Sequence, residues 1–345
     1  MRGPSTHRVD DQVARSFPRA GKASRPTLRR AAKHLAKALV RVTPQKLTRS
    51  VLRAGALAPP RLKTPLFEFV FSRLAAMSSP GSRELIRTNL GISRKLRCDI
   101  PLDKPTHLFG RPENMLAERS ALLLVAELVK DCKDFVDIGA NEGLFTFFIG
   151  HAAAGIGARC HWFEPDDDLR ERLIRNLAAN GVAAQGNGVA VSDRKGSATF
   201  HKNLSDDSSG SLTGHFTGKH STREIIVNTV TMSDYFRDQE IGSALVKIDV
   251  EGAGCAVWAG ASAVADRITY LVMEMLAPEI ESELPRKIIE AGFHAYYMRD
   301  FQLVEAPRGR FEYQAPFWNW LFSRLDPQRL AERLKGTRFQ VVRAG

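Results

Sequence analysis

The sequence lacks the run of about 18 to 20 apolar residues that a membrane-spanning helix needs. Its longest apolar run, residues 121–128, is far shorter and includes Glu127. The N-terminus also lacks the apolar block of a secretory signal. The four cysteines stand apart, with no pair at the spacing of a metal site. These absences favour a cytoplasmic protein whose thiols are reduced.

Acidic residues are scarce at the start of the chain. Residues 1–53 hold 14 Lys and Arg but two acids, so the net charge of +12 lies there and the remainder is neutral. Residues 27–42 place Ala and Leu on one helical face and Arg and Lys on the other. We expect an amphipathic helix that docks on the body or lies peripherally on the anionic inner face of a membrane. Nucleic acid binding and organellar import are the less favoured interpretations.

The chain divides into four predicted parts. Residues 1–59 are a basic leader, 60–130 a helical cap broken by prolines, 131–310 an α/β domain and 311–345 an aromatic C-terminal extension. Strands and helices alternate from residue 134 onward, which is typical of a doubly wound parallel sheet. The strands predicted in this part are 135–138, 159–163, 185–191, 244–249, 269–275 and 293–298.

The strongest motif is the strand and small-residue turn over residues 135–143. Asp137 ends the apolar strand, and Gly139 and Gly143 allow a sharp bend before an apolar helix. The spacing is not the G-x-G-x-x-G of a dinucleotide site, and Asp137 and Glu142 would repel a pyrophosphate. A donor with an ammonium and a sulfonium group suits these acids better. The turn therefore favours S-adenosylmethionine over a nicotinamide cofactor.

A second acid, Glu164, follows the next predicted strand about 20 residues further on. An acid at this place in a doubly wound sheet accepts hydrogen bonds from ribose hydroxyls. We therefore expect Glu164 to bind the ribose of the same donor.

A third acidic turn follows the strand over residues 244–249. Ligands of open α/β sheets bind at the carboxyl ends of the strands, so Asp249 and Glu251 should lie near the transferred group. Asp249 is the first candidate for deprotonating an acceptor hydroxyl and Glu251 the second; pairing with Lys247 or helix capping is the competing interpretation. Asp249 and Glu274 could also hold Mg²⁺, a less favoured cofactor that is not excluded.

Taken together, the motifs resemble FkbM-type methyltransferases over about residues 100–310. The matching segments are Asp-Ile-Gly-Ala-Asn-x-Gly at 137–143, Phe-Glu-Pro at 163–165, Asn-x-x-x-Asn at 176–180, Ala-Val-Ser-Asp at 190–193 and Lys-Ile-Asp-Val-Glu-Gly-Ala at 247–253. The resemblance implies a class I, Rossmann-like methyltransferase fold and S-adenosylmethionine as cofactor. The cofactor-binding residues that it implies are Asp137, Gly139, Ala140, Asn141, Gly143, Glu164, Ala190 and Asp193. The family usually has a glutamate where this chain has Gly254.

These expectations converge on transfer of a methyl group to an oxygen. The predicted acceptor is a hydroxyl of a saccharide, a glycolipid or another small molecule. Two alternatives remain open from the sequence. One is an RNA methyltransferase that uses the basic leader as an electrostatic arm. The other is a cofactor-binding protein without catalytic activity. This alternative stays open because the chain has Gly254 where the family usually has a glutamate.

Overall fold

The computed structural model describes residues 50, 83–88, 96–101, 112–204, 210–214, 221–237, 239–306, 311–312 and 318–343. The predicted amphipathic helix over 27–42 lies outside these residues, so its membrane role stays a prediction. Within the described part, no helix combines the length and apolar character needed to cross a bilayer.

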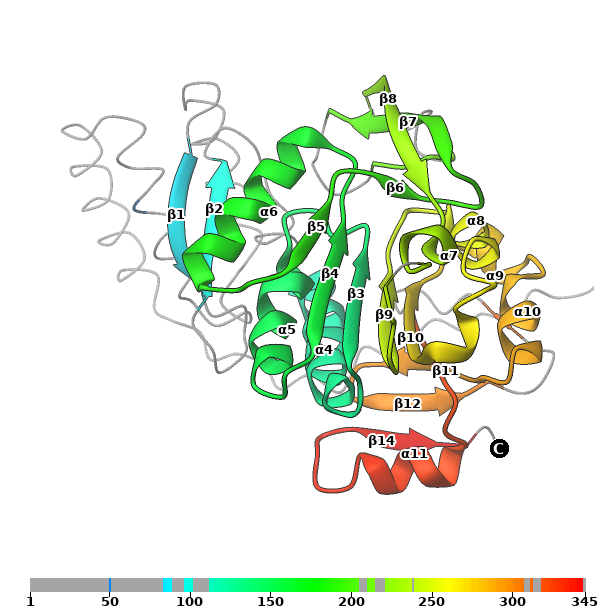
Figure 1. Ribbon diagram of the computed structural model, residues 1–345. Coiled ribbons are helices and arrows are strands. Elements are labelled where there is room, and N and C mark those ends of the chain that lie inside the picture. The colour runs from blue at the N-terminus through cyan, green and yellow to red at the C-terminus, as the bar shows by residue number, and fades with distance from the viewer. Residues whose placement is uncertain are drawn as a thin grey trace, which may run out of the picture.

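A nine-stranded sheet forms the centre of the protein (Figure 1). Its strands, in spatial order, are β14 (Gln340–Val342), β12 (Gln302–Glu305), β11 (His294–Arg299), β13 (Asn319–Ser323), β10 (Ile268–Glu274), β9 (Ala244–Ile248), β3 (Asp134–Ile138), β4 (Arg159–Phe163) and β5 (Gln185–Asn187). The five strands from β10 to β5 run parallel, so their carboxyl ends share one edge. In chain order they read 3-2-1-4-5 from β5 to β10, which confirms the class I methyltransferase fold.

Strand β13 differs from the predicted domain division. The segment over 311–345 is predicted to be an extension, but β13 lies inside the sheet, antiparallel to both β10 and β11. All five of its residues are buried. Trp320 and Phe322 of this strand pack in the core. The sheet therefore continues past residue 310.

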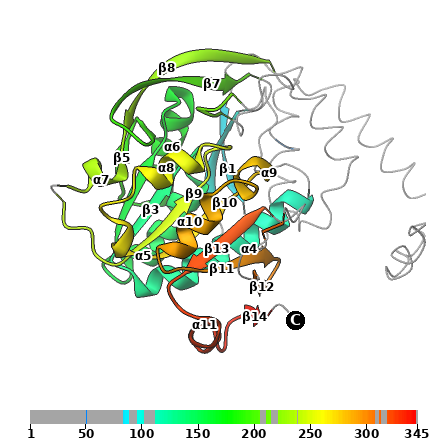
Figure 2. The ribbon, with the colours of Figure 1, turned by 90° about the vertical axis from the view of Figure 1, so that its right-hand side faces the viewer.

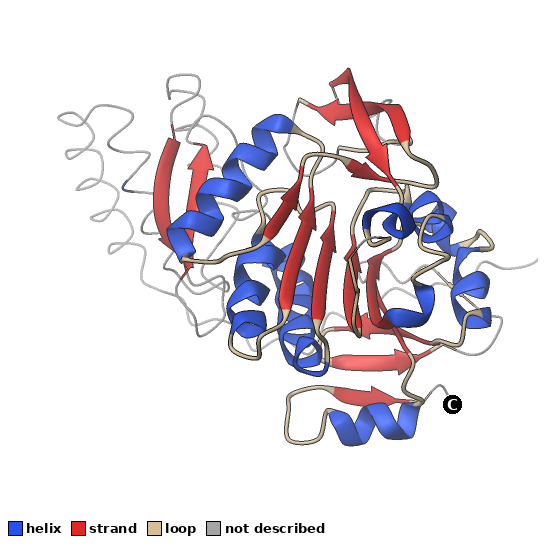
Figure 3. Ribbon diagram, viewed as in Figure 1, coloured by secondary structure: helices blue, strands red, loops and turns tan. Residues whose placement is uncertain are grey.

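Helices cover both faces of the sheet (Figure 3). One face packs against α4 (Pro112–Leu128), α5 (Leu144–Ala154), α6 (Asp167–Asn180) and α11 (Pro327–Arg333). The other packs against α7 (Met232–Tyr235), α8 (Gly254–Ala259), α9 (Ala277–Ile280) and α10 (Leu284–Glu290). The short strands have apolar residues on both sides because both faces are covered.

The predicted cap over 60–130 is not purely helical. Its described part contains the antiparallel strands β1 (Arg83–Thr88) and β2 (Leu96–Pro101) and the helix α4. Strand β2 contacts the end of α6. The side-chain amide of Asn180 accepts the N–H of Arg97 and donates to its carbonyl oxygen. Helix α4 belongs to the main core, where Leu124 and Leu128 are fully buried.

A second sheet of three strands lies beyond the carboxyl ends of the parallel strands (Figure 2). It consists of β6 (Ala190–Val191), β8 (Thr222–Val230) and β7 (Gly196–Asn203), in that order. Strands β7 and β8 run antiparallel over eight residue pairs. Strands β7 and β8 are not among those predicted from the sequence.

Candidate active site

The turn after β3 is built for close approach of backbone to backbone. Gly139 has a φ of +77°, and a Cβ atom there would overlap the carbonyl oxygen of Asp249. Its N–H, like that of Ala140, donates to the carbonyl oxygen of Phe163. Gly143, with a φ of +84°, leads into α5. Only glycine combines these conformations with this lack of space, so the turn is bound to the ends of both β4 and β9.

Glu164 lies directly beside this turn. Its two carboxylate oxygens accept the backbone N–H groups of Asn141 at 2.9 Å and of Asp166 at 2.8 Å. Burial raises the pKa of the Glu164 carboxyl from its usual 4.5 to about 7, although both N–H groups act in the opposite direction. Each oxygen has a further lone pair to offer a ligand hydroxyl.

A cavity opens between Glu164 and the ends of β3 and β9. It encloses about 590 Å³ of empty space, part of which is open to solvent. Its apolar lining comes mainly from residues after β4 and β5 and from the second sheet: Phe163, Pro165, Leu169, Val189, Ala190, Val191, Phe200 and Leu212. Its polar lining includes Asn141, Glu164, Asp249 and Glu251. The cavity therefore offers apolar walls to a flat apolar group and carboxylates to a polar, cationic one.

The structure brings most of the predicted site residues to this cavity. Gly139, Asn141, Glu164, Ala190, Asp249 and Glu251 line it. Ala140 and Gly143 shape the turn without lining it. Asp193 lies away from the lining: its side chain is half exposed and accepts a hydrogen bond from Ser192. Strand β6 ends at Val191, and the chain then bends toward the surface.

Asp137 is also separated from the cavity lining. It is fully buried below the turn, where one carboxylate oxygen accepts the Thr146 hydroxyl at 2.6 Å. The other oxygen makes no hydrogen bond and lies 3.9 Å from the ammonium of Lys247. Burial raises the pKa of Asp137, while Lys247 and Thr146 oppose the shift. Any influence of Asp137 on a cationic ligand is therefore electrostatic and acts through the turn.

Lys247 links this buried acid to the rim of the cavity. Its Nζ donates to Asp249 at 2.8 Å and lies 4.5 Å from the centre of the Phe145 ring. The lysine side chain is only 6% exposed, whereas that of Asp249 is 25% exposed. The pairing with Lys247 expected from the sequence is confirmed. Asp249 nonetheless remains accessible, so pairing and a chemical role are compatible.

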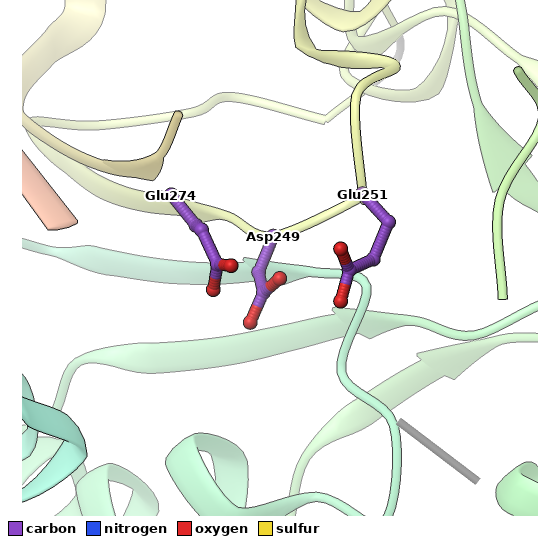
Figure 4. A group of neighbouring side chains, drawn as sticks. All are labelled: Asp249, Glu251 and Glu274. Atoms are coloured by element: carbon purple, nitrogen blue, oxygen red, sulfur yellow. The ribbon is translucent and has the colours of Figure 1, made fainter. Parts of the chain in front are cut away.

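Three carboxylates gather at the rim. Asp249, Glu251 and Glu274 each offer an oxygen within 4.8 Å of the others. Figure 4 shows their carboxylates pointing to the same side from neighbouring strand ends. Oxygen ligands at this separation have the chemistry that Mg²⁺ prefers, but half-exposed acids also gather at sites without an ion. The cluster therefore places three carboxylates, each a potential proton acceptor, near the glycine turn after β3.

Glu251 adopts a backbone conformation that is unusual for its residue type. Its φ is +51°, close to the +52° of Asn141 in the first turn. Its carbonyl oxygen accepts the hydroxyl of Ser211 at 2.6 Å and that of Thr213 at 3.3 Å. A non-glycine residue in this region costs about 1 to 3 kcal/mol unless its surroundings hold it. The hydrogen bonds from Ser211 and Thr213 to the Glu251 carbonyl oxygen help to keep the backbone in this conformation.

The structure explains the glycine at position 254. The carboxylate of Glu279 accepts the N–H of Gly254 at 2.7 Å and that of Leu276 at 3.1 Å. A Cβ at position 254 would lie 2.6 Å from the Glu279 oxygen. Burial raises the pKa of Glu279, with the two N–H groups opposing and Asp249 adding to the shift. An acid is therefore present beside position 254, and its carboxylate would have to shift to admit a side chain there.

The predicted site residues do not include Phe200, Gly210 and Leu212, which line the cavity. Phe200 lies on β7, whose residues are mostly small and polar. The one available signal is the run Ile225-Ile226-Val227 within β8, which is β-branched throughout. That run indicates a strand but not its partner, so the cavity wall was not predictable from it.

Comparison with known proteins agrees with these motifs. Residues 137–303 match the family model described as Methyltransferase FkbM domain. The chain therefore contains a domain of this family of S-adenosylmethionine-dependent methyltransferases. The comparison with curated proteins finds no match.

Solved structures show a partial likeness. An FkbM methyltransferase from Methylobacillus flagellatus KT has 14% identity and a TM-score of 0.35; the match covers 56% of this chain and 44% of that one. The N-terminal domain of human METTL16 in complex with SAH has 14% identity and a TM-score of 0.36, covering 67% and 76%. An rRNA methylase from Streptococcus thermophilus has 12% identity and a TM-score of 0.34, covering 63% and 98%. With scores this low, the fold rests on the order of the strands.

Proposed function

We propose that this protein, whose residues 137–303 form an FkbM methyltransferase domain, transfers a methyl group from S-adenosylmethionine to a hydroxyl of a saccharide, glycolipid or other small molecule. One observation carries the proposal. A single cavity is lined both by the buried Glu164, which follows β4, and by Asp249 and Glu251, which follow β9. Strand β3, with its glycine turn, lies between β4 and β9.

The residues present fit this cofactor. Glu164 has acceptor capacity for ribose hydroxyls, and the apolar walls suit an adenine ring. Three carboxylates and the buried Asp137 suit the cationic end of the molecule. When bound, S-adenosylmethionine supplies a methyl group activated by a positively charged sulfur. Asp137 and Glu142, in and beside the turn after β3, would instead repel the pyrophosphate of a dinucleotide.

Asp249 is the residue best placed to accept the acceptor's proton. It lines the cavity, and Lys247 fixes one of its oxygens at 2.8 Å. The other oxygen is then oriented toward the rim, where an acceptor hydroxyl can donate to it. With the donor bound, the hydroxyl oxygen would bond to the methyl carbon as the sulfur–methyl bond breaks, leaving the neutral thioether, and Asp249 would take up the hydroxyl proton. A positioned base of this kind contributes about 10²- to 10⁴-fold to the rate.

The experiment is incubation of the protein with methyl-labelled S-adenosylmethionine and fractionated cell extract. We expect label in a small-molecule or glycolipid fraction, with the methyl carbon identified as an ether by NMR. Asp249→Asn should reduce incorporation by about 10²-fold or more while cofactor binding persists. Asp266→Asn is the matched control, because Asp266 is an exposed acid outside the cavity lining.

Three results would contradict the proposal in different ways. Label on nitrogen would overturn O-methylation alone. Cofactor binding without transfer to any fraction would favour a non-catalytic protein. Binding of a nicotinamide dinucleotide in preference to S-adenosylmethionine would overturn the assignment of the cavity.

A further inference from the structure

One wall of the cavity comes from outside the main sheet. We call β7 together with residues 210–214 the strap. Phe200 of β7 and Leu212 both line the cavity, and a backbone bridge joins His201 to Ser211. Phe200 packs closely on Gly210, where an added Cβ would lie 2.6 Å from its ring. The strap is therefore a continuous surface that passes across the carboxyl ends of the parallel strands (Figure 2).

One end of the strap is attached by a buried ion pair. Lys202 Nζ lies 2.8 Å from an Asp166 oxygen and also contacts Asp168. The side chains of Lys202 and Asp166 are 10% and 3% exposed. Burial alone would lower the pKa of Lys202, but its hydrogen bonds to both aspartates outweigh that and raise it. The lysine is therefore charged, and removing it would leave Asp166 buried without its cation.

Asp166 connects this ion pair to the ligand-binding acid. Its backbone N–H donates to Glu164, and its side chain accepts the N–H groups of Asp168 and Leu169 at the start of α6. Lys202 and Phe200 are two residues apart on β7, and both are buried. Since side chains two apart on a strand share a face, the ion pair and the aromatic wall lie on the same side of β7.

The other end of the strap is attached to the acceptor side. The hydroxyl of Ser211 donates to the carbonyl oxygen of Glu251 at 2.6 Å, and the N–H of Thr213 donates back to the Ser211 hydroxyl. The strap thus spans the cavity from the residues next to Glu164 to the turn that carries Glu251. Movement of either end would displace Phe200 and Leu212 from the cavity.

We propose that Lys202 is a positioning residue for the cofactor: by its ion pair with Asp166 it holds Phe200 in place as the wall against which the adenine ring packs. This inference rests on the proposed function, because it takes the ligand to be an adenosyl compound. Lys202 does not line the cavity. Two routes lead from Lys202 to the ligand, one through Phe200 and one through Asp166 to Glu164. We assign the effect to Phe200; action through Glu164 would instead give losses that add in the double variant.

The test measures binding of S-adenosylhomocysteine to the full chain by calorimetry. Lys202→Met is expected to weaken binding about tenfold, with Lys202→Arg recovering most of the loss because it restores the cation. Phe200→Ala should weaken binding by a similar or larger factor. The double variant should be no weaker than Phe200→Ala alone, since Lys202 has nothing left to position. Lys195→Met is the matched control, an exposed lysine in the turn before β7.

The outcomes separate this inference from the proposed function. If the unaltered protein does not bind S-adenosylhomocysteine, both fail. If it binds and Lys202→Met binds equally well, only the role of Lys202 fails. Additive losses in the double variant would also overturn it, because Lys202 would then act independently of Phe200. Thermal unfolding of each unliganded variant shows whether it is folded, and Lys202→Arg provides the comparison should Lys202→Met not fold.

Discussion

The two halves of the cavity rim differ in what holds their carboxylates. On the donor side, Glu164 is buried and both its oxygens accept backbone N–H groups. On the acceptor side, Asp249 is partly exposed and is held by the flexible side chain of Lys247. The two turns nevertheless have similar backbones, with φ near +50° at Asn141 and Glu251. The two turns are therefore alike in backbone, while the carboxylates at the rim beside them differ in how rigidly they are held.

This difference suits the two ligands expected. A cofactor is the same molecule in every turnover, so a carboxylate fixed by the backbone loses little entropy on binding it. An acceptor must be aligned and must give up a proton, for which accessible carboxylates are needed. Substitutions in the donor half should therefore lower both stability and cofactor binding. Substitutions in the acceptor half should lower activity without lowering stability.

The largest expected effect is at the point where the two halves touch. Gly139→Ala would drive a Cβ into the backbone of Asp249, so we expect a loss of unfolding free energy on the order of 3 kcal/mol or more, together with loss of cofactor binding. Gly157→Ala is the matched control: its φ is similarly positive, at +72°, but no atom lies within 4 Å of an added Cβ. It should cost only about 1 kcal/mol. Equal losses in urea unfolding would show that the two halves are not in tight contact.

An intermediate effect is expected from pH on the donor side. Ribose hydroxyls donate to the ionised form of Glu164, whose pKa is raised to about 7. Below that pH, Glu164 must therefore lose its proton when the cofactor binds. Cofactor affinity should fall about tenfold for each pH unit below 7. Glu164→Gln should bind more weakly at pH 8 and lose this dependence. Calorimetry at pH 6 and pH 8 measures both, and a wild-type affinity that does not change with pH would remove Glu164 from ribose binding.

The same group has an opposite signature in the unliganded protein. The unfolded chain releases the Glu164 proton near 4.5, and the folded chain retains it to about 7. Between these values the folded state binds more protons, so the free energy of unfolding should decrease as pH rises through that window. Comparing Glu164→Gln with the unaltered protein isolates this contribution from those of other groups.

The smallest effect is expected on the acceptor side. Glu251→Gly relieves a positive φ, so we expect unfolding free energy to rise by up to about 1 kcal/mol while methyl transfer decreases. Asn141→Gly should change stability less, because asparagine tolerates this conformation better than glutamate does. Urea unfolding and label incorporation measure the two quantities. A destabilised Glu251→Gly would show that the side chain of Glu251 supports the fold, which would weaken the contrast between the halves.

The same contrast explains what the sequence could predict. The donor half is formed by residues 137–166, and the local pattern of strand, turn and acid identified Gly139, Asn141 and Glu164. The ends of α6 are likewise set by local signals, since Asp166 caps its start and Gly181 its end. Local signals suffice where the contacts are local.

Contacts between distant segments were not predictable in this way. Phe200 and Leu212 reach the cavity through pairing of β7 with β8 and with Ser211, which no local pattern encodes. The proximity of Glu279 to Gly254, 25 residues earlier, likewise depends on packing of α9 on α8. Asp193 matched a motif but lies off the cavity lining, since a motif identifies a position in the chain and not the direction of the bend that follows it.

The position of β13 has a consequence for how the protein is made. In the described sheet, β13 lies between β10 and β11, and its residues 319–323 are translated after both of them. Until that segment has left the ribosome, β10, whose last residue is Glu274, has an unpaired edge. The sheet can therefore close only late in synthesis, and a nascent chain that ends at residue 303 would carry every binding motif on an unfinished scaffold.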